Sequence, residues 1–95
     1  MVRNKGADCM FYYTYILRSK RDDRLYIGHT RNINKRLYEH NSGQVISTKS
    51  RCPLTLIFYE AYLSEKDSIR REKYFKSTKG KRTIKLMLKD YLSNM

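Results

Sequence analysis

The stretch RLYIGHTRNINKRLYEHN, residues 24–41, marks a change from strand to helix. Its first part, residues 25–29, is short and apolar and is stopped by a glycine, as expected of a strand. Asn32 is a good N-cap, apolar residues follow it at helical spacing, and the triplet NSG at 41–43 is a stop signal. We therefore expect a strand over 25–29 and a helix over 32–42.

The residues on either side of this stretch predict two further strands. FYYTYIL, residues 11–17, is rich in aromatic and β-branched residues, and the charged loop RSKRDDR follows it. So short a loop favours an antiparallel pair with residues 25–29, because a parallel pair needs a longer crossover. After the polar loop QVISTKSRCP, LTLIFYEAY at 54–62 predicts a third strand.

Two more helices are expected after the third strand. Ser64 would cap one that runs to about Ser77, with Asp67 in an approximate capping box, and Gly80 would break it. KRTIKLMLKDYL then predicts an amphipathic helix, with Ile84, Leu88 and Leu92 spaced four residues apart on one face. The expected order is β-β-α-β-α-α. This is an α/β fold of the α+β type, in which helices flank a small three-stranded antiparallel sheet.

Length and charge limit the organisation of the chain and its partners. The 95 residues suit one domain over 11–95, preceded by a flexible N-terminal lead-in at 1–10. Lys and Arg number 21 against 9 Asp and Glu, giving a formal net charge of +12. This excess favours a polyanionic partner, with DNA or RNA ahead of an anionic membrane surface or an acidic protein.

The cysteines and the apolar runs indicate the cellular compartment of the protein. Cys9 and Cys52 are far apart and neither belongs to a Cys-x-x-Cys pair, so we expect free thiols in a reducing cytosol rather than a zinc site. No apolar run reaches the ~18 residues that a membrane-spanning helix needs. The N-terminal segment also has no apolar core of a signal peptide. These features predict a cytoplasmic protein without a membrane partner.

Glu72 breaks the local pattern of the second expected helix. Ile69 and Phe75 lie three residues on either side, so the carboxylate points between two apolar side chains. Such a carboxylate is costly unless it is paired. Its partner is either a buried arginine or a divalent metal, and Lys76 lies on nearly the same face.

Polar side chains also gather around the strand-to-helix change. Arg36 and His40 are one helical turn apart, and Tyr15 and Tyr26 fall on neighbouring strands. Taken alone, Arg36 is more simply a solvated helix cation than a catalyst. A tyrosine is a poor base unless nearby cations lower its pKa, and Gly28 would let a phosphate approach the backbone.

Together these residues resemble the GIY-YIG nuclease family. The second half-motif is Tyr26-Ile27-Gly28, and the first appears as Tyr13-Thr14-Tyr15, with ten residues between Tyr15 and Tyr26. Arg36 matches the arginine of the family, Glu72 lies in a REK pattern, and His40 lies in EHNSG. The likeness is greatest to small single-domain members related to the N-terminal nuclease domain of the bacterial excision-repair nuclease. Tyr13 and Thr14 depart from the family's glycine and isoleucine, and the family's later asparagine has no counterpart before Asn94.

The resemblance implies an endonuclease that hydrolyses phosphodiester bonds with Mg²⁺ or Mn²⁺. Tyr26 would be the general base, assisted by His29, while Arg36 would hold the non-bridging oxygens and Glu72 would bind the metal. Tyr15 would hydrogen-bond to the phosphate or to water, and His40 would orient water or contact the substrate. The implied catalytic set is Tyr15, Tyr26, His29, Arg36, His40 and Glu72.

Basic residues outside this set are expected to hold the nucleic acid, most simply DNA. They are Lys35, Lys49, Arg51, Lys76, Lys81, Arg82 and Lys85. Contacts to phosphate position a substrate without reading its sequence, so we expect structure-specific cleavage in repair or recombination, or targeting by a protein partner. A non-catalytic DNA- or RNA-binding module on the same fold, or a basic protein–protein adaptor, are the alternatives.

Overall fold

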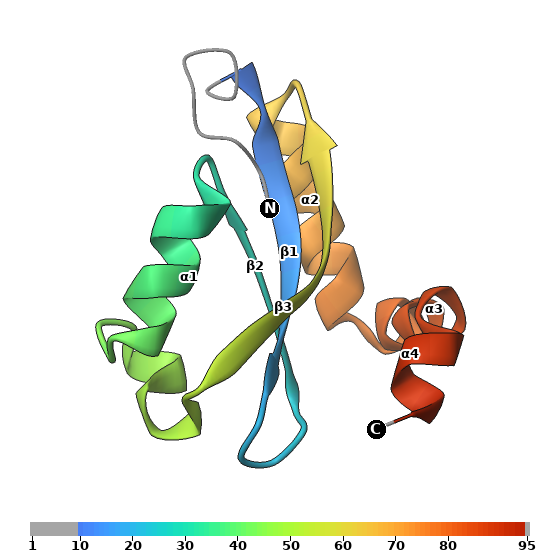
Figure 1. Ribbon diagram of the computed structural model, residues 1–95. Helices are drawn as coiled ribbons and strands as arrows, with labels where there is room; N and C mark the ends of the chain where they lie inside the picture. The colour runs from blue at the N-terminus through green and yellow to red at the C-terminus, as the bar shows by residue number, and fades with distance from the viewer. Residues whose placement is uncertain (1–9, 95) are drawn as a thin grey trace.

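The computed structural model describes residues 10–94, and its centre is a three-stranded antiparallel sheet (Figure 1). The strands are β1 (Tyr12–Ser19), β2 (Leu25–Thr30) and β3 (Leu54–Tyr62), in the order β2-β1-β3. β3 has the bounds that the sequence predicted, and the other two differ by one or two residues at an end. The predicted α+β fold, with helices flanking a three-stranded antiparallel sheet, is confirmed.

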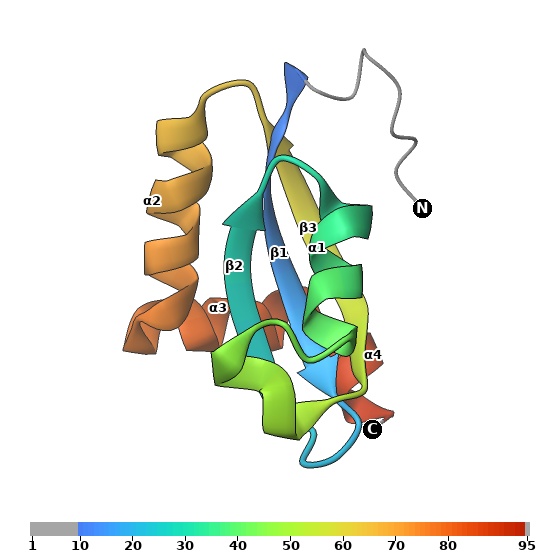
Figure 2. The same cartoon turned by 90° about the vertical axis from the view of Figure 1, so that its left-hand side faces the viewer.

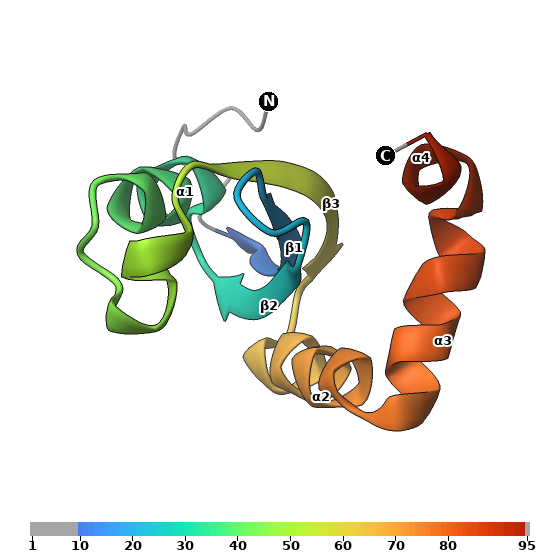
Figure 3. The same cartoon turned by 90° about the horizontal axis from the view of Figure 1, so that it is seen from below.

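The central strand β1 is buried on both faces, which explains its nearly continuous apolar run. Tyr15 and Leu17 pack with Leu54 on the face that α1 (Ile33–Asn41) covers. Ile16, between them in sequence, packs with Phe75 on the opposite face, under the later helices. Figure 3 shows the two layers of helices on different sides of the sheet, so the molecule has two small cores with β1 between them.

α1 begins and ends where the sequence signals predicted. The Asn32 side chain accepts a hydrogen bond from the Lys35 backbone N–H at 3.0 Å, and Gly43 follows the helix with a φ of 80°. The polar segment after it is not only a loop. It forms the 3₁₀ helix η2 (Ile46–Arg51), beside the end of α1 (Figure 2), and buries Thr48.

Three helices follow the sheet: α2 (Glu65–Lys76), α3 (Thr78–Met87) and α4 (Lys89–Ser93). Ser64 stands at the N-cap of α2 but its side chain makes no capping hydrogen bond. The prediction that Gly80 breaks the helical structure after Ser77 is wrong, because Gly80 lies in the first turn of α3 and Ser77 caps that helix. A Cβ at Gly80 would collide with the Tyr74 carbonyl oxygen, so glycine is needed for the close approach of α3 to α2.

The predicted third helix is divided at Leu88 into α3 and α4. Ile84 is buried and Leu88 packs against the same core, so the expected apolar stripe is present. The expected lead-in at 1–10 falls mainly on residues outside the described part of the chain, as does Cys9, whereas Cys52 is a free thiol. Within residues 10–94, no helix is long and apolar enough to cross a membrane.

Candidate active site

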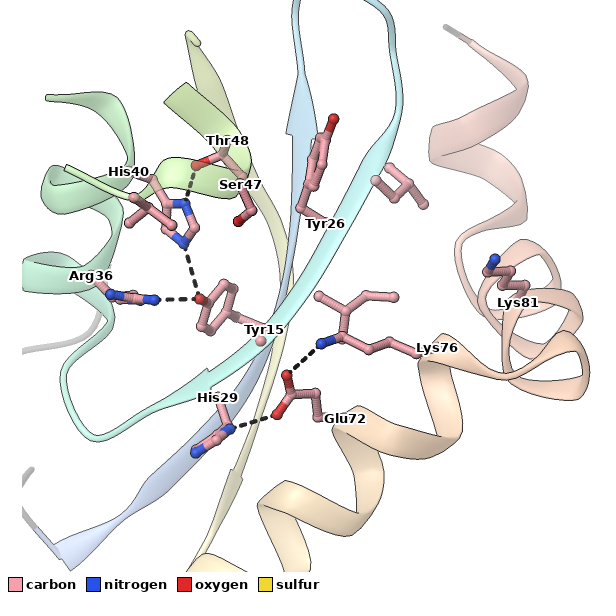
Figure 4. Close-up of a pocket in the computed structure, with 14 residues that line it drawn as sticks. Tyr15, Tyr26, His29, Arg36, His40, Ser47, Thr48, Glu72, Lys76 and Lys81 are labelled. Atoms are coloured by element: carbon pink, nitrogen blue, oxygen red, sulfur yellow. Dashed lines mark hydrogen bonds and ion pairs between the residues drawn. The ribbon is translucent and has the colours of Figure 1, made fainter. Parts of the chain in front are cut away.

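The predicted site residues lie around β2, the edge strand of the sheet. In the strand register Tyr15 is opposite Gly28 and Thr14 is opposite His29. Because successive strand residues point to opposite faces, Tyr15 lies on the α1 side of β2 and His29 on the α2 side. A cleft of about 500 Å³ is lined from both sides (Figure 4). Its polar lining is Tyr15, Tyr26, His29, Arg36, His40, Ser47, Thr48, Glu72, Lys76 and Lys81.

On the α1 side, the Tyr15 hydroxyl joins two residues of one helix face. Arg36 Nε donates to this hydroxyl at 3.4 Å, and His40 Nε2 lies 3.1 Å from it. A guanidinium can only donate, so the phenol oxygen accepts from Arg36 and its own proton is available to His40 or to a ligand. Arg36 Nη1 also donates to Glu39 at 3.1 Å, which fixes the plane of the guanidinium.

The protonation of this group follows from its burial. Burial raises the pKa of Tyr15 and outweighs the opposing effect of the Arg36 hydrogen bond. Burial, with the nearby Arg36 charge, lowers the pKa of His40. At neutral pH Tyr15 is therefore a neutral hydroxyl and His40 is a neutral imidazole that can accept a proton.

On the α2 side, Glu72 is held by two cationic or potentially cationic groups. Its Oε1 accepts from His29 Nδ1 at 2.5 Å and its Oε2 accepts from Lys76 Nζ at 2.8 Å. Burial raises the pKa of Glu72, but the hydrogen bonds from Lys76 and His29 outweigh it and the pKa is lowered, so the carboxylate is ionised.

The surroundings of Glu72 exclude one of the two partners that were expected for it. The carboxylate lies at the rim of the cleft rather than within the core, because its side chain keeps 15% exposure and lines the cavity. The prediction of a buried arginine partner is wrong, since the side chains that bind the Glu72 carboxylate in the described chain are His29 and Lys76. The metal alternative stays a prediction.

Gly28 lets the two sides meet. A Cβ at this position would collide with the hydroxyl and ring of Tyr15, so the absence of a side chain allows the phenol to reach over the edge strand. The charges of Glu72 and Lys76 lie close enough to Tyr15 to influence its pKa, in opposite directions and less than burial and Arg36 do. The sequence suggested that Gly28 would let a phosphate approach the backbone. On this face of the strand the Tyr15 ring fills that space instead.

Tyr26 and His29 are separated by the strand itself. Residues three apart on a strand point to opposite faces, and Tyr26 packs on the Tyr15 core while His29 contacts Glu72. Figure 4 shows the Tyr26 hydroxyl pointing away from Arg36 and Glu72, although the side chain lines the cleft. The geometry thus brings His29 to the acid and not to the tyrosine that it was expected to assist.

The predicted phosphate-binding residues lie in four different places. Lys76 and Lys81 line the cleft, and Lys35 lines a neighbouring hollow beside Arg36. Lys85 lies in a second groove next to Lys81. Lys49 and Arg82 are exposed but line none of these three hollows, and Arg51 forms an ion pair with Asp22 at 3.4 Å.

The sequence reasoning missed Thr48. Its Oγ1 lies 2.7 Å from His40 Nδ1, so the buried imidazole is engaged at both nitrogens. The Cys52 thiol donates to the His40 carbonyl at 3.0 Å and ties η2 to the end of α1. A polar segment without apolar periodicity gave no sign that it would form this wall of the cleft.

The donor set agrees with a magnesium site built mostly from water and substrate. The residues from 10 to 94 contain no group of three or more His, Cys, Asp or Glu side chains that could enclose a metal. Mg²⁺ is commonly held by one or two carboxylates, substrate phosphate and several waters. Glu72 is ionised and lines the cleft, so it fits this kind of site as the protein ligand.

Comparison with known proteins agrees with this geometry. The family model of the GIY-YIG catalytic domain matches residues 11–85. A UPF0213 protein of Staphylococcus haemolyticus is 34% identical over 77 residues, which cover 80% of this chain and 93% of that protein. UPF0213 proteins of Bacillus licheniformis and Pediococcus pentosaceus are 39% and 36% identical, covering 74% and 86% of this chain and 72% and 86% of those proteins. No solved structure gave a significant match.

The fold and the cleft therefore define a small domain of a nuclease family. Membership of such a family implies a nucleic-acid substrate. The chain belongs to the GIY-YIG family, and the UPF0213 proteins similar to it are its small single-domain relatives.

Proposed function

We propose that this protein is a Mg²⁺- or Mn²⁺-dependent endonuclease that hydrolyses phosphodiester bonds in structured DNA. The observation that carries the proposal is the meeting of Glu72 with the Tyr15–Arg36–His40 group around Gly28. An acidic ligand, a fixed guanidinium and a proton-accepting pair are the parts that phosphodiester hydrolysis requires.

Arg36 is suited to hold the non-bridging phosphate oxygens. Tyr15 and Glu39 engage Nε and Nη1, and no described residue takes a hydrogen bond from Nη2. Its planar donors match the geometry of a phosphate. The guanidinium would then stabilise negative charge as it builds on the phosphorus oxygens.

The Tyr15–His40 pair can remove the proton of the attacking water. The water proton passes to the phenol oxygen while the phenol proton passes to His40 Nε2, and the hydroxide so formed attacks phosphorus. This relay needs a neutral His40, which its lowered pKa provides. Tyr26 as the general base is the alternative that the family resemblance implies, and the two are distinguished by Tyr15→Phe and Tyr26→Phe.

Glu72 would hold the divalent ion, which when bound supplies charge neutralisation at the phosphate and the leaving oxygen. Lys76 and His29 balance the carboxylate charge before the ion binds. The Lys76 side chain is 56% exposed, so it is free to turn from Glu72 toward an incoming phosphate.

One observation favours the non-catalytic module instead: both oxygens of Glu72 already have hydrogen-bond partners. Titration of Mg²⁺ into the metal-free protein, followed by NMR at Glu72, Tyr15 and Tyr26, distinguishes the nuclease from the binding module. Chemical-shift changes confined to the surroundings of Glu72 support the nuclease. Retained DNA binding without any chemical-shift response to the metal supports the binding module.

The substrate is proposed to be structure-specific DNA, such as a branch, flap or single-strand junction, in repair or recombination. The cations of the cleft are suited to phosphates, which carry no sequence information. A protein partner could supply targeting. We place the reaction in the cytoplasm, in keeping with the free thiol of Cys52.

A further inference from the structure

A second groove lies beside the cleft, between the β1–β2 hairpin and the α3–α4 segment. Its volume is about 540 Å³, which is within the range of about 300–1,000 Å³ for ligand sites. It shares Leu25, Ile27 and Lys81 with the cleft, so the two hollows join along β2. Figure 4 shows Lys81 on α3 across the cleft from β2, at this junction.

The groove has an apolar floor and a basic rim. Leu25, Ile27, Ile84 and Leu92 form the floor. Lys81 and Lys85 stand on the rim beside α3, and Arg24 lines the hairpin end. The ammonium groups of Lys81 and Lys85 have no hydrogen-bond or ion-pair partner among residues 10–94. A ligand that combines anionic groups with flat apolar faces would satisfy both features.

We infer that this groove binds an unpaired segment of the nucleic-acid strand that enters the cleft. In a duplex the base faces are stacked inside, and only phosphates and groove edges are presented to a protein. A bound duplex would therefore leave the apolar floor exposed to water. An unpaired strand can lay its base faces on the floor and its phosphates against the lysines. The inference rests on the proposed function, which puts the scissile phosphate in the adjoining cleft.

The far end of the groove is lined by Asp23 and Arg24. The Asp23 carboxylate is paired with Arg18 at 3.0 Å, and the Arg24 side chain is largely exposed, so a phosphate that reaches this end meets a further cation. Because the groove adjoins the cleft, the single-stranded part of the substrate is recognised next to the cleavage point.

Methyl NMR of the full chain in EDTA locates the strand without cleavage. The probes are a blunt duplex, the same duplex with a short oligothymidylate tail, and that duplex with an abasic tail. The tailed duplex should shift the methyl signals of Leu25, Ile27 and Leu92, and should bind at least about fivefold more tightly than the blunt one, the low end for one stacked base. The abasic tail should lose most of this gain.

A charge reversal at the rim gives an independent readout. Lys85→Glu should lower the affinity for the tailed duplex and reduce the slope of log affinity against log salt by about one. Lys66→Glu is the matched control, because Lys66 is an exposed lysine of α2 that lines neither hollow, and it should leave the tail preference unchanged.

Equal methyl shifts with blunt and tailed duplexes, or equal affinity for abasic and base-bearing tails, would overturn the inference. Because these measurements are made without metal, they are independent of catalysis. Tail-dependent shifts in a protein that never cleaves would reject the proposed function alone. Cleavage by a protein without those shifts would reject the groove alone.

Discussion

The Tyr15 hydroxyl occupies the space in which a side chain at residue 28 would begin, so Tyr15 and Gly28 pack as one unit across two strands. This contact carries a phenol from the buried central strand over the edge strand and into the cleft. It explains why a half-motif ending in glycine and a tyrosine of the other half-motif belong to one site.

Gly28→Ala should lower both stability and cleavage. The added methyl group must displace the Tyr15 ring from a packed core, at a cost of about 1–3 kcal/mol in the free energy of unfolding. Thermal unfolding and a cleavage assay measure the two effects. Tyr15→Phe is the comparison, because it keeps the ring and should lose cleavage with much less loss of stability. Full activity and stability in Gly28→Ala would show that the packing is not needed.

Thr48→Val should disturb His40 and slow cleavage. The isosteric change removes the oxygen 2.7 Å from Nδ1, so the buried imidazole loses the partner that fixes its tautomer. The ¹⁵N chemical shifts of His40 report the tautomer directly, and Thr48→Ser should restore both the shifts and the rate. A slower variant with unchanged His40 shifts would instead indicate a general packing defect.

Arg36→Ala should reduce turnover far more than DNA affinity, because the guanidinium is expected to act on charge that grows during the reaction. Arg36→Lys should recover little, since a lysine cannot reproduce the planar donors that contact Tyr15 and Glu39. Single-turnover cleavage and binding in EDTA separate the two quantities. A fall in affinity and its salt dependence alone would favour the binding module.

Glu72→Gln should remove part of the acid sensitivity of folding. Although burial raises the pKa of Glu72, Lys76 and His29 lower it below the ordinary value of 4.5. A lowered pKa in the folded state contributes stability above 4.5 and loses it as the pH falls through the folded value. The difference in unfolding free energy between wild type and Glu72→Gln should therefore shrink on acidification below 4.5. A constant difference across that range would contradict the pairing.

Most of the secondary structure was predictable, because it depends on sequence patterns within each strand or helix. Residues 54–62 form β3 as expected, and helical spacing placed Arg36 and His40 on one face. The position of His29 was not predictable, because it depends on the register of β2 against β1. Thr48 was missed because a short 3₁₀ helix has no apolar periodicity, and the neighbours of Glu72 depend on how α2 packs on the sheet.

The most direct test of the central claim is cleavage of a branched DNA by the purified protein, with Mg²⁺ or with EDTA, for wild type, Glu72→Ala and Glu65→Ala. Glu65 is an exposed glutamate in the first turn of the same helix and serves as the matched control. We expect Mg²⁺-dependent cleavage by wild type and Glu65→Ala, and no cleavage by Glu72→Ala, which still binds the DNA. Equal cleavage by all three proteins, or none by any of them, would contradict the account.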